Sequence, residues 1–358
     1  MSGPFQVAVI PGDGIGVEVT ASALRVLEAA LPPGTLDFTH LPWGSEHYKR
    51  TGAMIEPGGV DRLRDFDAIL FGASGDPTVP DHVSLRGLRL AICQGLDQYV
   101  GYRPSRRLTG VPSPLRSDEP FDFLIIRENT EGEYAGAGGR VHRGLPTETA
   151  TQTAIFSRAG IERIVEYAFE QAAARRGHLT SITKSNAQEF GLGLWDEVVG
   201  ERAAAHPDVK VRTLLVDAAA ARLVLAPHEF DVIVASNLFG DILSDLGGAL
   251  VGSLGMAASG NLDPTGSSPS MFEPVHGSAP DIVGRGIANP VGAIASAALL
   301  LDTLGLADES AAITAAVEEV LRAGVGTPDI GGTASGDEMV AAIVGSVKER
   351  CDGTTQAA

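Results

Sequence analysis

The chain is predicted to be an α/β protein, and two observations predict it. Short β-rich runs alternate with longer stretches of helical periodicity through most of the 358 residues, which is typical of helices that pack on both sides of a sheet. The chain also has 44 glycines, as expected for many tight turns between closely packed elements. This length allows two domains or one large α/β unit.

The expected strands are short and apolar, and the expected helices follow the 3.6-residue period. Strands are expected at 6–10, 67–71, 122–127, 180–184, 210–216 and 231–236. Helices are expected at 16–30, 84–99, 158–176, 189–206 and 240–250, and at 291–304, 310–323 and 338–348 in an alanine-rich last quarter that reads as scaffold. A flexible tail is expected over 352–358.

The net charge of −18 argues against a nucleic-acid partner and against an anionic membrane surface. Cys93 and Cys351 are the only cysteines and give no disulfide framework. The first residues lack the basic and apolar regions of a signal peptide, and no apolar run is long enough to span a membrane. These features predict a soluble, cytoplasmic protein.

The segment 131–153 is rich in glycine, threonine and charged residues. It has too few apolar residues to form a core of its own, so we expect an exposed, hairpin-like arm. Such arms are often exchanged between subunits.

Gly12, Gly14 and Gly16 follow the first expected strand, where a dinucleotide-binding fingerprint would lie. Their spacing is G-x-G-x-G instead of G-x-G-x-x-G, and no acidic residue ends a clear second strand about twenty residues later. The motif is therefore weak evidence for a Rossmann site.

A buried strand at 231–236 leads into a helix that carries Asp241 and Asp245. Carboxylates four residues apart face the same side of a helix and can share one hard divalent cation. A solvated acidic face is the ordinary alternative, but the rest of this helix is small and apolar. Two unpaired carboxylates would repel each other there, so the pair is a candidate metal site.

Six short segments carry a more specific pattern. They are Arg103-Pro104, Arg127-Glu-Asn-Thr-Glu-Gly-Glu-Tyr134, Thr183-Lys-Ser-Asn186, Val216-Asp217-Ala218, Asn237-Leu-Phe-Gly-Asp241-x-x-x-Asp245, and Phe272-Glu-Pro-Val-His276-Gly-Ser-Ala-Pro-Asp281-Ile282 with Ala288-Asn289-Pro290. In this order they resemble the isocitrate/isopropylmalate dehydrogenase family of β-decarboxylating 2-hydroxyacid dehydrogenases. The resemblance covers nearly the whole chain and is strongest to the tartrate/D-malate dehydrogenase branch, for example at Asp97-Gln-Tyr-Val100.

The resemblance implies a two-domain, isopropylmalate dehydrogenase-like α/β/α sandwich that is not a Rossmann fold. A cofactor-binding domain would comprise residues 1–100 and 252–358, and an inserted domain that carries the arm would comprise 101–251. A homodimer is also implied, because the active sites of the family lie in the cleft between domains and take residues from both subunits.

The reaction implied by the resemblance is the oxidation of a 2-hydroxy acid, with hydride transfer to NAD, followed by decarboxylation. Mg²⁺ or Mn²⁺ would be held by Asp241 and Asp245 of one subunit and Asp217 of its partner, and would stabilise the developing enolate. Lys184 and Tyr134 match the residues that remove and return protons in the family.

Arginine binds carboxylates through two parallel hydrogen bonds, and Arg103 and Arg127 match two of the family's three substrate-binding arginines. The third position is occupied by Cys93. Arg89 and Arg86 lie about one and two turns earlier on the same expected helix stripe, where relatives read the substituent at C3. We therefore expect Arg89 and Arg86 to bind the substrate.

This expectation favours a small-molecule substrate of the malate type with an anionic group at C3. The group would be a carboxylate, as in isocitrate, or a phosphonate, as in phosphonomethylmalate. A neutral isopropyl group would leave buried arginines unpaired, which disfavours 3-isopropylmalate. A D-malate or tartrate dehydrogenase of broad specificity, with Arg89 incidental, and a catalytically inactive family member are the alternatives.

The resemblance also assigns NAD as the cofactor. Asp281 and Ile282 stand where NAD enzymes of the family carry aspartate and isoleucine, and a carboxylate repels the 2′-phosphate of NADP. Glu273 and His276 would contact the nicotinamide ribose and adenine sides, although His276 could also be an ordinary core histidine. The expected NAD-binding residues are Asn186, Glu273, His276, Gly277, Ser278, Ala279, Asp281, Ile282 and Asn289.

Overall fold

A computed structural model of the protein describes residues 3–355. The chain divides into two compact units, and we describe each by itself. Unit 1 comprises Met1–Gln98, Arg107–Pro114 and Gly248–Ala358, and unit 2 comprises Tyr99–Arg106 and Leu115–Gly247. The segment Arg107–Pro114 thus packs with unit 1, although the sequence assigns it to the inserted domain.

Unit 1 contains five strands in the order β2-β1-β3-β12-β11. They are β1 (Phe5–Gly12), β2 (Leu36–His40), β3 (Ala68–Ala73), β11 (Ala258–Leu262) and β12 (Ser270–Pro274). The strands β2, β1, β3 and β12 are parallel, whereas β11 is antiparallel to β12. The antiparallel strand distinguishes this unit from an all-parallel Rossmann sheet.

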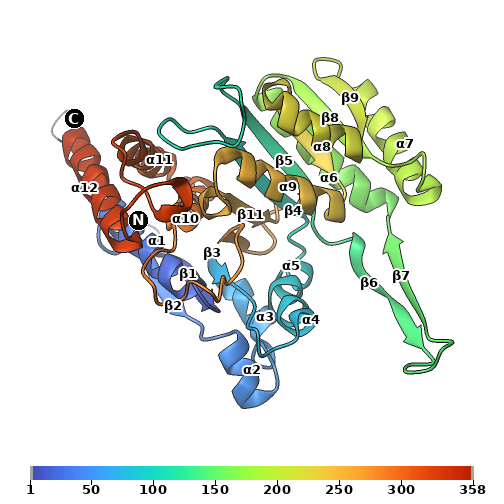
Figure 1. The fold of residues 1–358 in the computed structure, drawn as a ribbon, viewed down its shortest axis with the longest axis horizontal. Coiled ribbons are helices and arrows are strands. Elements are labelled where there is room, and N and C mark those ends of the chain that lie inside the picture. Colours follow the sequence, from blue (N-terminus) through green and yellow to red (C-terminus); the bar gives the residue numbers. More distant parts are fainter. Residues whose placement is uncertain (1–2, 356–358) are drawn as a thin grey trace. The chain divides into compact units, whose positions relative to one another are not determined.

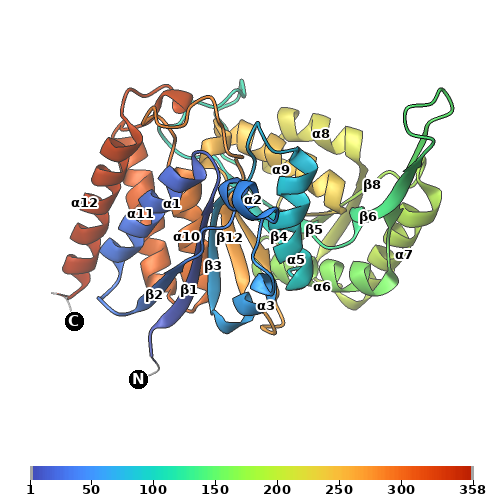
Figure 2. The same cartoon turned by 90° about the horizontal axis from the view of Figure 1, so that it is seen from below.

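Helices cover both faces of this sheet, as the alternation in the sequence predicts. They are α1 (Gly16–Ala30), α2 (Ser45–Thr51), α3 (Gly59–Arg62), α4 (Asp81–Ser84), α5 (Leu90–Gly95), α10 (Val291–Thr303), α11 (Ala307–Arg322) and α12 (Gly336–Thr355), with 3₁₀ turns at Leu63–Asp65, Leu254–Met256 and Pro328–Ile330. On one face, α1 and α10 pack on the strands, and α11 and α12 pack on these helices (Figure 2). On the other face, Ile10 and Phe71 of the sheet join Leu88 and Ile92 in a buried cluster. Burial on both faces explains the continuous apolar strands.

The expected helix at 84–99 is interrupted. A π-helical turn at Leu85–Arg89 separates α4 from α5, and α5 ends at Gly95. The following Asp97 has a left-handed φ of 48°, which a continuing helix would not allow. The expected helix is therefore found, but it contains a π-turn and ends at Gly95 instead of residue 99. The π-turn changes the angular relation of the residues on either side of it.

Unit 2 also contains five sheet strands, in the order β4-β5-β10-β8-β9. They are β4 (Val100–Arg106), β5 (Asp122–Glu128), β8 (His178–Thr183), β9 (Lys210–Leu215) and β10 (Val232–Ala235). The strands β5, β10, β8 and β9 run parallel, and β4 is antiparallel to β5. The helices of this unit are α6 (Arg158–Ala174), α7 (Glu189–Ala205), α8 (Val216–Leu225) and the start of α9 (Asn237–Val251), with a 3₁₀ turn at Pro227–Glu229.

The predicted arm is a two-stranded ribbon of β6 (Gly132–Val141) and β7 (Thr149–Ile155) that extends away from the other elements of unit 2 (Figure 1). All of β7 is exposed, and Val141 and Leu145 are each 56% exposed. An isolated hairpin of this kind is marginally stable in water. The structure thus contains the expected exposed hairpin, and its exchange between subunits stays a prediction.

The other expected strands and helices are found, with end points that differ by a few residues. The expected tail is partly wrong, because α12 extends through Thr355; residues 356–358 lie outside the part of the chain that the structure describes. Within the described residues, none of the helices combines the length and apolar character needed to cross a membrane.

The glycine motif after β1 has a structural role centred on Asp13. Its buried carboxylate accepts hydrogen bonds from the Ser45 backbone N–H at 2.7 Å, the Ser45 hydroxyl at 2.8 Å and the Gly75 N–H at 2.8 Å. Gly14 has a φ of +58°, and a Cβ there would lie 2.1 Å from the Ser278 carbonyl oxygen. The motif thus packs main chains together and holds the segment that contains Ser278.

We expect Asp13→Ala to reduce the free energy of unfolding of unit 1 by about 3 kcal/mol, because it leaves buried donors without a charged acceptor. Ser45→Ala removes one of these bonds and is expected to cost about 1 kcal/mol. Trp43 lies in unit 1 and Trp195 in unit 2, so urea unfolding followed by fluorescence in a Trp195→Phe background reports on unit 1. Equal losses in the two variants would contradict this role of Asp13.

Candidate functional site

In unit 2, the expected site residues follow the carboxyl ends of parallel strands. Arg127 is near the end of β5, Lys184 directly follows β8, and Asp217 is in the first turn of α8, directly after β9. Helix α9, which carries Asp241 and Asp245, begins after β10. Because β5, β10, β8 and β9 are parallel, these residues share one edge of the sheet, where open α/β sheets bind ligands.

Arg127 is the most enclosed of these residues, with 1% of its side chain exposed. Its Nε and Nη2 donate to Oδ1 of Asn237 at 3.0 and 2.7 Å, and its Nη1 donates to Oδ1 of Asp241. Its guanidinium carbon lies 5.4 Å from the ring centroid of Tyr134. The buried charge is therefore paired and oriented by α9.

Two glycines make room for Arg127. A Cβ at Gly101 would lie 3.0 Å from Cβ of Arg127, and one at Gly240 would lie 2.7 Å from the same atom. This close approach explains the glycine in the Asn237-Leu-Phe-Gly-Asp241 motif.

The β4–β5 register places the second expected substrate arginine on the same face. Gly101 lies opposite Arg127, and Arg103 lies opposite Ile125. Residues 101 and 103 point to the same side of a strand, so Arg103 and Arg127 are diagonal neighbours. Arg103 is 5% exposed, which makes both arginines buried cations.

Tyr134 is brought to the site from the base of the arm. Its hydroxyl donates to Oδ2 of Asp241 at 2.9 Å, so Asp241 accepts from both Tyr134 and Arg127. Glu133, one residue earlier, accepts from the Ser236 hydroxyl at 2.9 Å and from the Leu238 N–H at 3.0 Å. The Glu133 carboxylate thus ties the arm to the start of α9.

Two further residues position these groups, and we did not predict them. Asn237 holds Arg127 and also donates to the Glu131 carbonyl at 3.0 Å. The Glu131 carboxylate accepts from the Ser157 N–H at 2.9 Å and from its hydroxyl at 2.6 Å, at the start of α6. Both residues lie inside the motifs quoted above, but their types alone do not reveal a positioning role.

Asp241 and Asp245 are four residues apart on α9 and therefore face the same side of it. Asp241 is 36% exposed and Asp245 is exposed, so carboxylate oxygens of the type that Mg²⁺ and Mn²⁺ prefer lie at the surface. Within residues 3–355 of a single chain, no three acidic, histidine or cysteine side chains gather into a possible metal site.

Lys184 and Asp217 form a separate pair. Nζ of Lys184 donates to Oδ1 of Asp217 at 2.6 Å, and 65% of the Asp217 side chain is exposed. This hydrogen bond is the main cause that lowers the pKa of Asp217. The pair is thus an exposed carboxylate and ammonium held together at the ends of β8 and β9.

In unit 1, Glu273 and His276 lie on and just after β12. Glu273 is buried, and Arg89 and Asn261 both donate to its Oε1, at 2.7 and 2.8 Å. Nδ1 of His276 lies 2.9 Å from the Gly277 carbonyl oxygen. A carbonyl can only accept, so Nδ1 carries the proton and Nε2 is an acceptor.

The acceptor Nε2 of His276 is buried and has no hydrogen-bond partner among the described residues. Burial is also the main cause that lowers the pKa of His276 below its ordinary 6.5, which favours the neutral ring. A neutral imidazole with an unused, buried acceptor fits a ligand N–H group, such as the amino group of an adenine.

The segment after His276 forms a compact turn. Ala279 has a left-handed φ of 39°, and Ile282 N–H donates to the Ala279 carbonyl at 3.1 Å. The Ser278 carbonyl accepts from Ile15 N–H at 2.9 Å, whereas Gly277 and Asp281 are exposed. The turn thus presents the Asp281 carboxylate to solvent.

The two expected asparagines differ in their surroundings. The buried Asn289 donates to Asp329 at 3.0 Å and accepts from Val291 N–H at 3.0 Å at the start of α10. Its side chain therefore stabilises unit 1 itself. Asn186 is exposed in unit 2, in the turn after Lys184.

The residues expected on one helix stripe have three different environments. Arg86 is exposed, 12% of the Arg89 side chain is exposed, and Cys93 is fully buried in the core cluster of unit 1. Cys93 therefore serves as a packing residue. Arg89 pairs with Glu273 and also donates to Oδ1 of Asn261 at 3.0 Å, so its charge is compensated within the unit.

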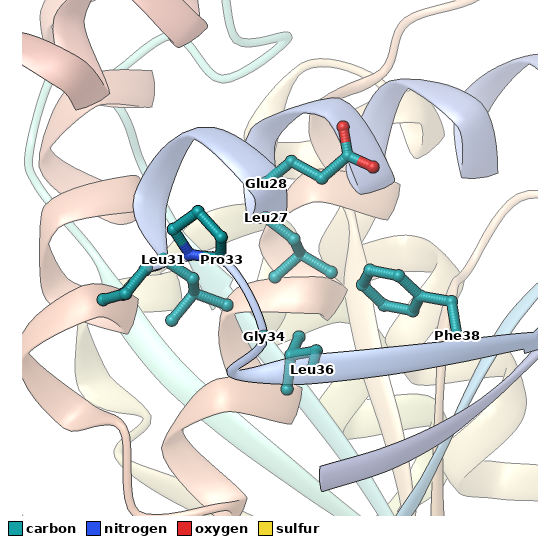
Figure 3. A pocket seen from close by; sticks show the side chains of 8 residues that line it. Leu27, Glu28, Leu31, Pro33, Gly34, Leu36 and Phe38 are labelled. Atoms are coloured by element: carbon teal, nitrogen blue, oxygen red, sulfur yellow. The ribbon is translucent and has the colours of Figure 1, made fainter. Parts of the chain in front are cut away.

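A hollow of about 190 Å³ lies between the end of α1 and the start of β2 (Figure 3). Leu27, Leu31, Leu36 and Phe38 line it, and none of the expected site residues does. It therefore belongs to the scaffold.

Comparisons with known proteins agree with the resemblance. A profile of the isocitrate/isopropylmalate dehydrogenase family matches residues 6–343. The chain is 52% identical over 350 residues to a protein of Agrobacterium vitis named "probable tartrate dehydrogenase/decarboxylase", which covers 96% of this chain and 98% of the relative. It is 48% identical over 351 residues to the decarboxylating D-malate dehydrogenase of Escherichia coli (strain K12), covering 95% and 97% of the two chains.

Among solved structures, the isocitrate dehydrogenase of Methylococcus capsulatus superposes with a TM-score of 0.89 at 33% identity, covering 96% of this chain and 99% of that chain. The expected fold class is thereby confirmed. The chain belongs to the isocitrate/isopropylmalate dehydrogenase family.

Proposed function

We propose that the protein oxidises and decarboxylates a malate-type 2-hydroxy acid of the D-malate or tartrate class, using NAD and Mg²⁺ or Mn²⁺. One observation carries the proposal: Asp241 accepts hydrogen bonds from both Arg127 and Tyr134. The proposal assigns carboxylate binding to Arg127, proton donation to Tyr134 and metal binding to Asp241, and the contacts that join these three side chains support it. The names of the tartrate and D-malate relatives support the substrate class.

The expected anionic group at C3 has less support. It rests on the expectation that Arg89 and Arg86 are buried cations that need a substrate anion. However, Arg89 lies 2.7 Å from the Glu273 carboxylate, and Arg86 is exposed. Substrates with two carboxylates and a small C3 group need no further cation than Arg103 and Arg127. We therefore place D-malate and tartrate before isocitrate and phosphonomethylmalate.

Each residue has a defined task in this proposal. Arg103 and Arg127 would bind and orient the substrate carboxylates, which arginine does with two parallel hydrogen bonds. Lys184 would take the proton of the 2-hydroxyl, and Tyr134 would return a proton to C3 after loss of CO₂. When bound, the divalent ion would act as a Lewis acid and NAD would accept the hydride.

We expect NADH formation from D-malate or tartrate to require Mg²⁺ or Mn²⁺ and to stop with chelator. Asp241→Asn removes a metal-ligating charge and the partner of Arg127, so kcat/KM is expected to fall at least about a hundredfold. Initial rates measured as NADH absorbance and CO₂ release check this.

Asp208→Asn is the matched control, because Asp208 is an exposed aspartate of unit 2 outside the expected site. Full activity in the presence of chelator would contradict the metal assignment. If kcat/KM is higher for isocitrate or phosphonomethylmalate than for D-malate and tartrate, the substrate carries an anionic group at C3, as the sequence predicts.

We expect the wild-type enzyme to use NAD at a kcat/KM at least about tenfold above that for NADP, because the exposed Asp281 carboxylate repels a 2′-phosphate. Asp281→Asn should lower the ratio of kcat/KM for NAD to kcat/KM for NADP. Asp302 is an exposed aspartate at the end of α10, and Asp302→Asn should leave this ratio unchanged. Faster turnover of NADP by the wild type would be incompatible with the assignment.

We also propose a homodimer in which Asp217 and Lys184 serve the active site of the partner. Three observations support it. A single chain does not gather three metal ligands among its described residues. Asp217 is largely exposed. Apolar side chains are exposed on the same unit, at Ile242 beside Asp241 and at Val141 and Leu145 of the arm.

Mixed dimers test this sharing. Asp217→Asn and Asp241→Asn should each be inactive, but their heterodimer contains one intact site, so equal mixing should restore about a quarter of the wild-type activity. Asp241→Asn mixed with Asp245→Asn is the control, because every mixed site then keeps one defect. Recovery in the control, or none in the test mixture, would refute the shared site.

A further inference from the structure

Arg89, Asn261 and Glu273 are joined to one another by hydrogen bonds inside unit 1. Arg89 ends the π-helical turn, Asn261 lies on β11 and Glu273 lies on β12. Nε of Arg89 donates to Oε1 of Glu273 at 2.7 Å, and Nη2 donates to Oδ1 of Asn261 at 3.0 Å. Nδ2 of Asn261 then donates to the same Oε1 at 2.8 Å. Each residue therefore contacts the other two.

The strand register fixes two members of the network. Ser259 lies opposite Glu273, so Asn261 is the diagonal neighbour of Glu273 on the same face of the β11–β12 pair. Asn261 is fully buried, and 6% of the Glu273 side chain is exposed. A carboxylate in this position needs a compensating cation, since burial of an unpaired charge is costly. Arg89 supplies that cation from a different element.

We infer that Arg89 is a positioning residue that keeps the Glu273 carboxylate aimed for the ribose of the nicotinamide cofactor, and that it does not select the C3 substituent of the substrate. The inference rests on the proposed use of NAD. Its physical basis is that an ionised carboxylate held by two donors is pre-organised to accept a ribose hydroxyl. A carboxylate without these donors would be free to adopt other rotamers.

The π-helical turn contributes to this geometry. It places Arg89 toward β11 and β12, while Arg86 of the same turn is exposed. Cys93, one turn after Arg89, is fully buried in the apolar core of unit 1. Arg89 is thus the cation of this segment whose guanidinium is bound to the sheet.

NADH binding in the absence of substrate and metal tests the inference. We expect Arg89→Gln to raise the dissociation constant of NADH, measured by its fluorescence, at least about tenfold, the size expected for loss of a charged hydrogen bond. Arg89→Lys should restore part of the affinity, because it keeps the charge. In a Glu273→Gln background, Arg89→Gln should change the constant less than about twofold, because coupled residues are not additive.

Arg62→Gln is the matched control. Arg62 pairs with Glu56 at 2.8 Å in the same unit, but this pair is partly exposed and outside the expected site. Arg62→Gln should leave NADH binding unchanged. In steady-state kinetics, Arg89→Gln should raise KM for NAD while the ratio of kcat/KM between D-malate and isocitrate stays constant.

The outcomes separate the two roles of Arg89. Unchanged NADH affinity together with a changed substrate ratio would overturn the inference and assign Arg89 to the substrate. Equal losses from Arg89→Gln in the wild-type and Glu273→Gln backgrounds would overturn it too, because the two residues would then act independently. A wild-type protein that binds no NADH would overturn the cofactor proposal itself, and this inference with it.

Discussion

A guanidinium that is almost completely buried has to be neutralised where it lies, and Arg127 imposes this requirement on unit 2. Asp241 provides the negative charge, Asn237 provides the second acceptor, and Gly101 and Gly240 provide the space. Tyr134 then joins through the same Asp241 carboxylate. The start of α9, the base of the arm and the end of β5 are therefore held together around the buried guanidinium of Arg127. The proposed chemistry uses the side chains of the same residues.

Unit 1 contains buried carboxylates, which also need hydrogen-bond partners. Asp13 is satisfied by backbone and hydroxyl donors and holds loops together, whereas Glu273 requires an arginine from another element. The first carboxylate shapes the framework of the expected cofactor segment, and the second lies on β12, which is flanked by β3 and β11. In both units these buried charges are met by several hydrogen-bond partners, which is the condition under which buried charge is tolerated.

The periodic parts of the fold could be predicted from the sequence, because strands such as β5 and β10 and helices such as α1 are marked by apolar runs and by period. The strands β2, β4, β11 and β12 are not among those that the sequence predicts. In β4, Arg103 and Pro104 break the apolar pattern, and the π-helical turn is hidden because Leu85–Arg89 has an ordinary helical pattern. The expected site residues are identified by the sequence motifs in which they lie. The partners Asn237, Asn261 and Glu133 could not be foreseen, because tertiary contacts and not residue type give them their roles.

The π-helical turn at Leu85–Arg89 has an evolutionary consequence. A π-turn is one residue longer than an α-turn, and each residue of an α-helix advances by about 100° around the axis. Deletion of a single residue in this turn would regularise the helix and rotate everything before it, including Arg86, by about that angle relative to α5. A lineage could thus redirect a surface cation by a one-codon deletion, without any change of side-chain chemistry. Chain length at this turn therefore sets the direction of Arg86 in its own right, which comparisons of residue identity alone would overlook.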